Sequence, residues 1–316
     1  MRIVFAGTPA VAEPTLVTLA AAHDVVAVVT RLDAPLGRRR VLTPSPVAQR
    51  AEALGLTVIK ANRLDAGVTQ QIAALQPDLG VIVAYGGFVR EPLLSTPRLG
   101  WINLHFSLLP RWRGAAPVQY AVMAGDEVTG ASVFQLVPAM DAGAVFATLT
   151  KTIGAHQTAG NLLDSLAVDG AELVAQVVDG LESGTAVATA QSGAVTLAPK
   201  LSLDDARLEW NRPAAVVYQQ LRGVTPEPGA FTVVNGQRLK ILEAEPARDV
   251  RTLAAGHIRL ESGSPVVGTE DVPIRLVRVQ PAGRTIMPAA DWWRGLAAHT
   301  PTVDSGTAAQ NELVAE

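Results

Sequence analysis

Three polar residues in one stretch of the chain have the side chains needed to manage a tetrahedral intermediate. Asn103 and His105 lie two positions apart in an apolar run, and Asp141 follows in a segment of small residues. On a β-strand, residues two positions apart project from the same face. The spacing therefore predicts a neutral amide donor and a titratable base side by side, with a carboxylate nearby.

Acyl transfer from a carbonyl to an amine is the chemistry that needs such a set. The Asn103 amide would donate to the carbonyl oxygen as negative charge grows there, a role worth about 2.7 to 4 kcal/mol per donor. His105 would be the second donor and general acid. Asp141 would favour the imidazolium form and accept the amine's proton, directly or through water. Ser107 is interpreted as a loop and ligand-contact residue, because no second base is evident beside it.

The local context favours a catalytic interpretation of these residues over the ordinary structural one. A single histidine on an apolar strand is more often a core residue than a catalyst, and Asp141 alone is typical of a turn. The abrupt loop SLLPRWRGAAP, which follows the strand directly, indicates a pocket mouth at the strand's end. Arg111 and Arg113 in this loop are each interpreted as solvated charges.

Composition predicts an ordinary globular protein of one large or two smaller domains. The 316 residues are 48% hydrophobic and 17% charged, and none is cysteine. The five histidines show no metal-ligand spacing, so we expect no metal. Pro9, Glu13 and Pro14 interrupt the apolar N-terminus, which excludes a secretory signal, and no later window suits a membrane-spanning helix. We therefore expect a soluble, cytoplasmic, monomeric protein that binds no membrane.

Charge gives little indication of a nucleic-acid partner. The net charge is −3, with 14 basic against 15 acidic residues up to Lys200 and 12 against 14 after it. A protein that binds nucleic acid through global charge usually carries a basic face. Two local clusters of basic residues remain. One is Arg38-Arg39-Arg40, and the other is a set of four arginines between residues 272 and 300, a range that contains one acidic residue, Asp291.

Short apolar runs alternate with helical patterns through the first part of the chain. This rhythm predicts an α/β fold with a doubly wound, mostly parallel sheet of Rossmann type. Ligands bind such sheets beyond the carboxyl ends of the strands, which is where Asn103 and His105 are expected. A long amphipathic helix is predicted over residues 158–182. Gly7-Thr8-Pro9 lacks the G-x-G-x-x-G spacing, so no nucleotide cofactor is expected.

After about residue 205 the pattern changes to a helical stretch at 213–222 and then to short strands separated by turns. Asn235-Gly236 between two alternating runs is a strong hairpin signal. Several short strands in about 80 residues suggest a small barrel of the oligonucleotide-binding (OB) type. The predicted organisation is a catalytic domain at 1–183, a linker at 184–204, an OB-like domain at 205–300 and a disordered tail at 301–316.

Four segments spread along the chain resemble the 10-formyltetrahydrofolate-dependent formyltransferases. They are FAGTP at the N-terminus, PLGRRRVLTPSPV at 35–47, the run from Asn103 to Gly114 with the later Asp141-Ala142-Gly143, and VQPAGRTIMPAADWW at 279–293. The resemblance covers nearly the whole length. It implies transfer of a formyl group from 10-formyltetrahydrofolate to the free amino group of methionyl-initiator tRNA, and a tRNA-binding role for the OB-like domain at 205–300.

The resemblance also implies a role for particular residues. Asn103, His105 and Asp141 are the expected catalytic trio. The expected folate contacts are Ser107, Leu108, Leu109 and Pro110. The loop from Asp33 to Thr43 is expected to touch the acceptor end of the tRNA through Arg38, Arg39 and Arg40, with Arg38 matching the family's loop arginine.

Other functions share the first-domain motif and stay open at this point. Glycinamide ribonucleotide formyltransferases resemble only the first ~200 residues, and a formyltetrahydrofolate hydrolase or a sugar-nucleotide formyltransferase would have a similar first domain. The tRNA loop favours none of these. A non-catalytic RNA-binding or folate-sensing protein on the same scaffold is a further alternative, against which the intact trio argues.

Overall fold

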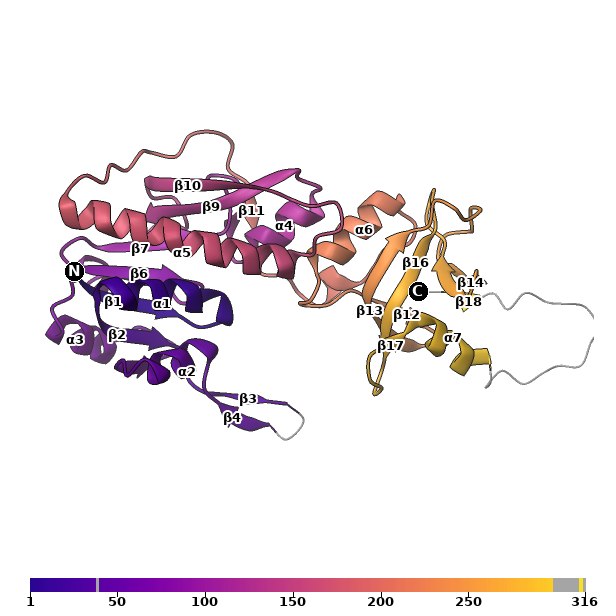
Figure 1. Cartoon of the computed structure of the whole chain (residues 1–316), viewed down its shortest axis with the longest axis horizontal. Helices are drawn as coiled ribbons and strands as arrows, with labels where there is room; N and C mark the ends of the chain where they lie inside the picture. The colour runs from indigo at the N-terminus through magenta and orange to yellow at the C-terminus, as the bar shows by residue number, and fades with distance from the viewer. Residues whose placement is uncertain (38–39, 298–312, 315–316) are drawn as a thin grey trace, which may run out of the picture. The chain divides into compact units, whose positions relative to one another are not determined.

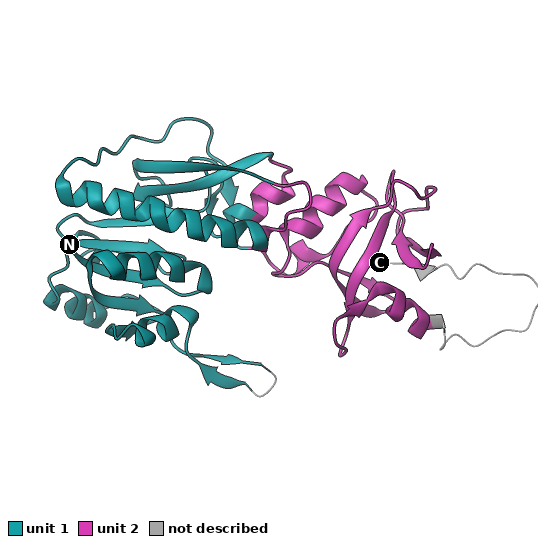
Figure 2. Cartoon of the chain, viewed as in Figure 1, with its two compact units in different colours: residues 1–118, 127–153, 161–200 teal, residues 119–126, 154–160, 201–316 magenta. Residues whose placement is uncertain are grey.

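The computed structural model describes residues 1–37, 40–297 and 313–314. The described chain forms two compact units, shown in Figure 2. Unit 1 comprises residues 1–118, 127–153 and 161–200, and unit 2 comprises 119–126, 154–160 and 201–316. The predicted tail at 301–316 lies outside the described residues, apart from the short strand β18 (Leu313–Val314). None of the described helices has the length and apolar character that crossing a membrane requires.

Unit 1 is built on a seven-stranded sheet in the order β10-β9-β7-β6-β1-β2-β5 (Figure 1). The strands are β1 (Arg2–Gly7), β2 (Asp24–Thr30), β5 (Val58–Lys60), β6 (Leu79–Val83), β7 (Trp101–His105), β9 (Val128–Gln135) and β10 (Val145–Thr152). The first five are parallel, and β9 and β10 add an antiparallel edge. The predicted doubly wound, mostly parallel sheet is confirmed.

Helices join and cover these strands. They are α1 (Glu13–Ala22), α2 (Pro46–Ala53), α3 (Ala66–Ala74) and α5 (Ala159–Ser183), with 3-10 turns at Ala10–Ala12 and Leu93–Ser95. Helix α4 (Pro117–Met123) begins in unit 1, but most of its residues belong to unit 2. Side-chain caps at the start of α2 and α3 fit the preference for serine and aspartate there, since Ser45 and Asp65 each accept a backbone N–H. The long amphipathic helix predicted at 158–182 is confirmed as α5.

The strand that carries Asn103 and His105 is anchored at its start and along one face. Trp101 at the start of β7 is fully buried, and its indole N–H donates to the carbonyl of Leu93 at 2.9 Å. Only glycine fits at position 80 on the neighbouring strand, because a Cβ there would lie 2.1 Å from the Trp101 ring. Gly170 of α5 also lets Leu104 approach closely, since a Cβ there would lie 2.8 Å from the Leu104 side chain. These contacts fix the position of β7 in the sheet.

Residues 184–200, most of the predicted linker, belong to unit 1 in the structure. Their backbone pairs with two parts of that unit: Thr189 bridges Val145, and β11 (Leu197–Ala198) pairs in parallel with β8 (Arg113–Gly114). Small and polar residues are typical of flexible linkers, but they also suit an extended segment that is held by backbone hydrogen bonds. Composition does not distinguish these two cases.

Unit 2 contains an antiparallel sheet in the order β12-β13-β16-β15-β14-β18, with β17 paired to β16. Its strands are β12 (Phe231–Val234), β13 (Gln237–Pro246), β14 (His257–Glu261), β15 (Ser264–Val267), β16 (Ile274–Pro281) and β17 (Met287–Pro288). A 3-10 turn (Asp204–Ala206) and helices α6 (Ala214–Gly223) and α7 (Ala289–Ala297) accompany it. Trp210, Trp292 and Trp293 lie in its core. The predicted small barrel corresponds to this curled antiparallel half-barrel.

The predicted Asn235-Gly236 hairpin is confirmed. Asn235 and Gly236 have φ values of 50° and 69°, and they connect β12 to β13 through the pair Val234 and Gln237. Two consecutive left-handed residues match the right-handed twist of the flanking strands. A second hairpin, β3 (Ala34–Leu36) with β4 (Val41–Thr43), lies in unit 1.

Candidate active site

A cavity of about 340 Å³ in unit 1 brings Asn103, His105 and Asp141 together. Its walls come from the carboxyl ends of β6 and β7 and from the loop that follows β9. The lining also includes apolar side chains and two adjacent glycines: Ile82, Tyr85, Gly86, Gly87, Phe88, Leu104, Leu136 and Val137. The size and the few convergent polar groups are typical of a small-molecule site. The position fits the rule for open α/β sheets.

His105 is buried and its ring orientation is fixed by the loop that follows β7. The side chain is 6% exposed, and Nε2 lies 2.8 Å from the carbonyl oxygen of Trp112. A carbonyl can only accept, so Nε2 carries the hydrogen and donates it. The neutral imidazole therefore presents the lone pair of Nδ1 on its other edge. The edge of His105 also meets the Phe134 ring, at 6.4 Å between centroids.

Asp141 faces the free edge of His105. Its Oδ2 lies 3.9 Å from Nδ1 and accepts the N–H of Gly114 at 2.8 Å. The distance to Nδ1 is too long for a hydrogen bond but short enough for an ion pair once the ring is protonated. Asp141 has a φ of 48°, in the left-handed region that aspartate tolerates better than most residues.

Burial and charge act on His105 in opposite directions. Removal of the ring from water lowers its pKa below the usual 6.5, and this outweighs the upward effects of the Asp141 carboxylate and of the bond to Trp112. The predicted influence of Asp141 thus has the expected sign, but it does not make the imidazolium the resting form. The resting imidazole is instead neutral and can act as a base. Once the ring is protonated, the Asp141 carboxylate can pair with it.

Asp141→Asn is expected to lower the pKa of His105 further, because the only charge that raises it is removed. The imidazole resonances followed by NMR over pH measure this directly. In the wild type, the folded protein binds fewer protons at His105 than the unfolded chain as pH falls from 6.5 towards the lowered pKa. His105 therefore costs nothing well above pH 6.5, costs increasing stability as pH falls through that window, and costs the full amount below the lowered pKa. An unchanged or higher pKa in Asp141→Asn would contradict this electrostatic account.

The folate residues expected from the resemblance lie on the loop after β7 but not in the cavity lining. Ser107 is fully buried, and its hydroxyl donates to the carbonyl of Arg111 at 2.6 Å. Ser132 accepts the N–H of Leu109 and donates to the carbonyl of Ser107. Ser107 therefore shapes this loop, while folate contact by residues 107–110 stays a prediction.

The expected tRNA loop lies at the β3–β4 hairpin. Arg38 and Arg39 are outside the described residues. Arg40 is exposed, with a φ of 49° and its N–H donating to the carbonyl of Gly37. Leu36 and Leu42 on the same hairpin are each 67% exposed. These two leucines lie on the paired strands beside the turn, and exposed apolar side chains grouped in this way suit a contact with a partner.

Sequence reasoning missed several residues that shape the site. Trp112 holds the His105 ring through its backbone carbonyl, and the Gln191 side chain holds the Asp141 loop from 50 positions away. Neither contact leaves a periodic signal in the sequence. Tyr85 and Phe88 line the cavity from the loop after β6. The position of that loop, directly after a predicted parallel strand, is a signal that could have identified it as part of the site.

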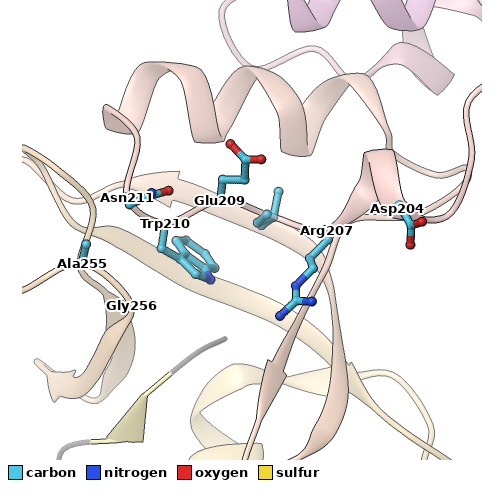
Figure 3. A pocket seen from close by; sticks show the side chains of 8 residues that line it. Asp204, Arg207, Glu209, Trp210, Asn211, Ala255 and Gly256 are labelled. Carbon is cyan, nitrogen blue, oxygen red and sulfur yellow. The ribbon is translucent and has the colours of Figure 1, made fainter.

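A second cavity, of about 390 Å³, lies in unit 2 and holds none of the trio (Figure 3). Its lining includes Arg207 and the acidic residues Asp204 and Glu209. Trp210 is 4% exposed and its indole N–H donates to the Thr232 hydroxyl at 2.9 Å, so this ring is part of the core. We assign no ligand to this cavity.

One described His/Asp/Glu group, His23 with Asp179 and Glu182, has metal-ligand spacing, and none of its members lines either cavity.

Fold and site together define a formyltransferase-type α/β enzyme. A formyl transferase domain model matches residues 1–178, and a formyl transferase C-terminal domain model matches residues 200–297. An N-formyltransferase from Helicobacter canadensis, crystallised with folinic acid and dTDP-3-aminofucose, has the same fold with a TM-score of 0.67. It is 14% identical, over 88% of this chain and 98% of that one.

Two relatives are much more similar in sequence. The methionyl-tRNA formyltransferase of Clavibacter sepedonicus is 60% identical over 297 residues, which cover 94% of this chain and 97% of that protein. That of Thermobifida fusca is 49% identical over 93% of this chain and 96% of its own length. The chain belongs to the formyltransferase family, and it matches both domains of these relatives.

Proposed function

We propose that this enzyme transfers a formyl group from 10-formyltetrahydrofolate to the α-amino group of methionyl-initiator tRNA. The observation that carries the proposal is one cavity that holds an amide donor, a neutral imidazole and a carboxylate, in a chain whose relatives of 49% to 60% identity are methionyl-tRNA formyltransferases. Similarity along both domains favours this acceptor over the smaller acceptors of enzymes that share only the first domain.

The cavity suits the formyl donor. Its apolar walls and backbone groups fit a flat heteroaromatic ring, and its volume lies at the lower end of the range for ligand pockets. The folate supplies a formyl carbon bonded to a nitrogen that must leave. Residues 107–110 would then contact the part of the folate that extends beyond the cavity.

The three residues of the trio have different roles in this reaction. The Asn103 amide donates to the formyl oxygen as the amine attacks and negative charge grows there. Nδ1 of neutral His105 takes the proton that the amine must lose, and the resulting imidazolium faces Asp141. The same proton then goes to the departing nitrogen, which restores the neutral ring. His105 is thus base and acid in turn.

The tRNA would be held by the β3–β4 hairpin and by unit 2. Arg38, Arg39 and Arg40 supply charge to the hairpin, beside its exposed leucines. In unit 2, Arg275 already pairs with Glu245 and Asp249, and Arg294 with Asp291. Arg278 and Arg284 are exposed on β16 and the turn that follows, and they remain available for phosphate.

Arg38→Ala is expected to lower kcat/KM on initiator methionyl-tRNA by roughly 10-fold while Arg40→Ala has a smaller effect, as for loss of one specific nucleic-acid contact. Parallel kinetics on initiator and elongator methionyl-tRNA measure this, and Arg63→Ala is the matched control for loss of one arginine charge elsewhere in unit 1. Equal losses at positions 38 and 40 would indicate nonspecific phosphate attraction. No loss at either position would remove the hairpin from tRNA recognition.

Acceptor choice tests the proposed function. Consumption of 10-formyltetrahydrofolate should require an aminoacylated tRNA with a free amino group and should stop when that amino group is acetylated. Glycinamide ribonucleotide and dTDP-3-aminofucose should be poor acceptors. Rapid turnover with either of them would show that the chain formylates another acceptor. Rapid release of formate without any acceptor would show that it hydrolyses the formyl donor.

A further inference from the structure

One segment, residues 189–198, contacts both of the backbone regions that hold the His105 and Asp141 side chains. Its members reach back over long stretches of sequence to the loop after β7 and to the loop after β9. None of its residues lines the cavity. The segment therefore contributes no side chain to the cavity that holds the trio, and its influence on the trio must pass through other residues.

Gln191 joins this segment to the Asp141 loop. Its side-chain Nε2 donates to the carbonyls of Asp141 and Gly143, both at 2.8 Å. Its Oε1 in turn accepts from the Arg113 guanidinium, at 2.6 Å from Nη2 and 3.2 Å from Nε. Both ends of this amide are therefore engaged, the NH2 group as donor and the oxygen as acceptor, which fixes its orientation. The carbonyls that it holds belong to the turn in which Asp141 has a left-handed conformation.

Thr196 joins the same segment to the other side of His105. Its hydroxyl accepts the N–H of Trp112 at 2.8 Å, and the Trp112 carbonyl accepts from Nε2 of His105. Trp112 has a φ of 60°, a conformation that is costly for a bulky residue and persists only where the surroundings impose it.

β11 completes the connection. Gly114, whose N–H donates to the Asp141 carboxylate, pairs with Ala198 and has a φ of 126°. A Cβ at this position would lie 2.5 Å from the Ala198 carbonyl oxygen. The 189–198 segment thus contacts each of the residues whose backbone fixes the pair: the Asp141 turn through Gln191, Trp112 through Thr196, and Gly114 through Ala198.

We propose that Gln191 and Thr196 are positioning residues, which set the 3.9 Å approach of Asp141 to His105 and the direction of the His105 ring. This inference rests on the proposed function. Proton transfer requires an oriented base, and a displacement of about 1 Å at a catalytic group can lower a rate roughly 100-fold. Loss of either contact should reduce kcat without removing any group that binds substrate.

The test uses Gln191→Met and Thr196→Val in the full chain, which keep side-chain volume and remove the hydrogen bonds. We expect kcat to fall roughly 10- to 100-fold with KM values for folate and tRNA little changed. We also expect the His105 pKa, followed by NMR, to fall in Gln191→Met as Asp141 moves away. That shift should vanish when Gln191→Met is combined with Asp141→Asn, because the charge through which Gln191 acts is already gone.

Gln220→Met is the matched control. Gln220 is also a partly buried glutamine whose amide donates to two backbone carbonyls, those of Asp205 and Arg207, but it belongs to unit 2. It should lose stability without any change in the His105 pKa. Wild-type kcat and pKa in Gln191→Met and Thr196→Val would overturn the proposal, and so would a loss of kcat that only tracks lost stability, as in Gln220→Met. Absence of transfer by the wild type would instead refute the proposed function, while the NMR shift would still test the positioning role.

Discussion

Replacement of His105 with alanine is expected to reduce kcat by about 10²- to 10⁴-fold, the range that positioned acid–base groups supply. The neutral ring presents Nδ1 towards the Asp141 side of the cavity, and no second histidine lines that cavity. Without the ring, the amine has no adjacent base and the departing nitrogen has no adjacent acid. Single-turnover formylation of methionyl-tRNA measures the loss separately from product release.

Two controls separate chemistry from folding in this variant. His105 is buried, so alanine also leaves the Trp112 carbonyl without its donor, and some loss of stability is expected. His105→Gln retains a donor for that carbonyl but cannot titrate, and it should be equally slow. Folate affinity should persist in both variants, and added imidazole should partly restore His105→Ala. A folded variant within a few-fold of wild type would refute the assignment of His105.

Asn103→Asp is expected to reduce kcat by about 10²- to 10³-fold, as for the removal of one oxyanion donor. The substitution preserves shape on β7 but replaces an N–H donor with an acceptor that repels the growing negative charge. Asn103→Ala, which removes the donor without adding charge, should lose less. The comparison requires kcat at saturating folate, because the donor acts chiefly in the transition state.

The outcome for Asn103 distinguishes two roles. If the amide stabilises the oxyanion, kcat falls in both variants and the folate KM changes little. If it binds the ground-state carbonyl, KM rises and kcat is retained. The second outcome would leave His105 without a partner for the developing charge and would contradict the division of labour proposed for the trio.

Much of unit 1 could be predicted because its elements carry local signals. Continuous apolar strands alternate with helical patterns, and the i, i+2 spacing of Asn103 and His105 places both on one cavity. The Asn235-Gly236 hairpin and helix α5 have equally local signals. Each of these features depends on residues within a few positions of one another.

The parts that escaped prediction depend on distant backbone contacts. The segment after α5 has the composition of a linker, yet Gln191 and Thr196 bind loops about 50 and 84 positions away. The lowered pKa of His105 likewise follows from three-dimensional burial, which outweighs the Asp141 carboxylate that the sequence already revealed.

The fate of a labelled formyl group tests the central claim most directly. 10-Formyltetrahydrofolate labelled in the formyl carbon is incubated with the enzyme and methionyl-initiator tRNA, and the amino acid is then released from the tRNA by mild base. The account predicts that the label is recovered as N-formylmethionine, in amounts equal to the tetrahydrofolate formed, and that His105→Ala abolishes this recovery. Label that remains on the folate, or that appears as free formate at the same rate with and without tRNA, would contradict the account.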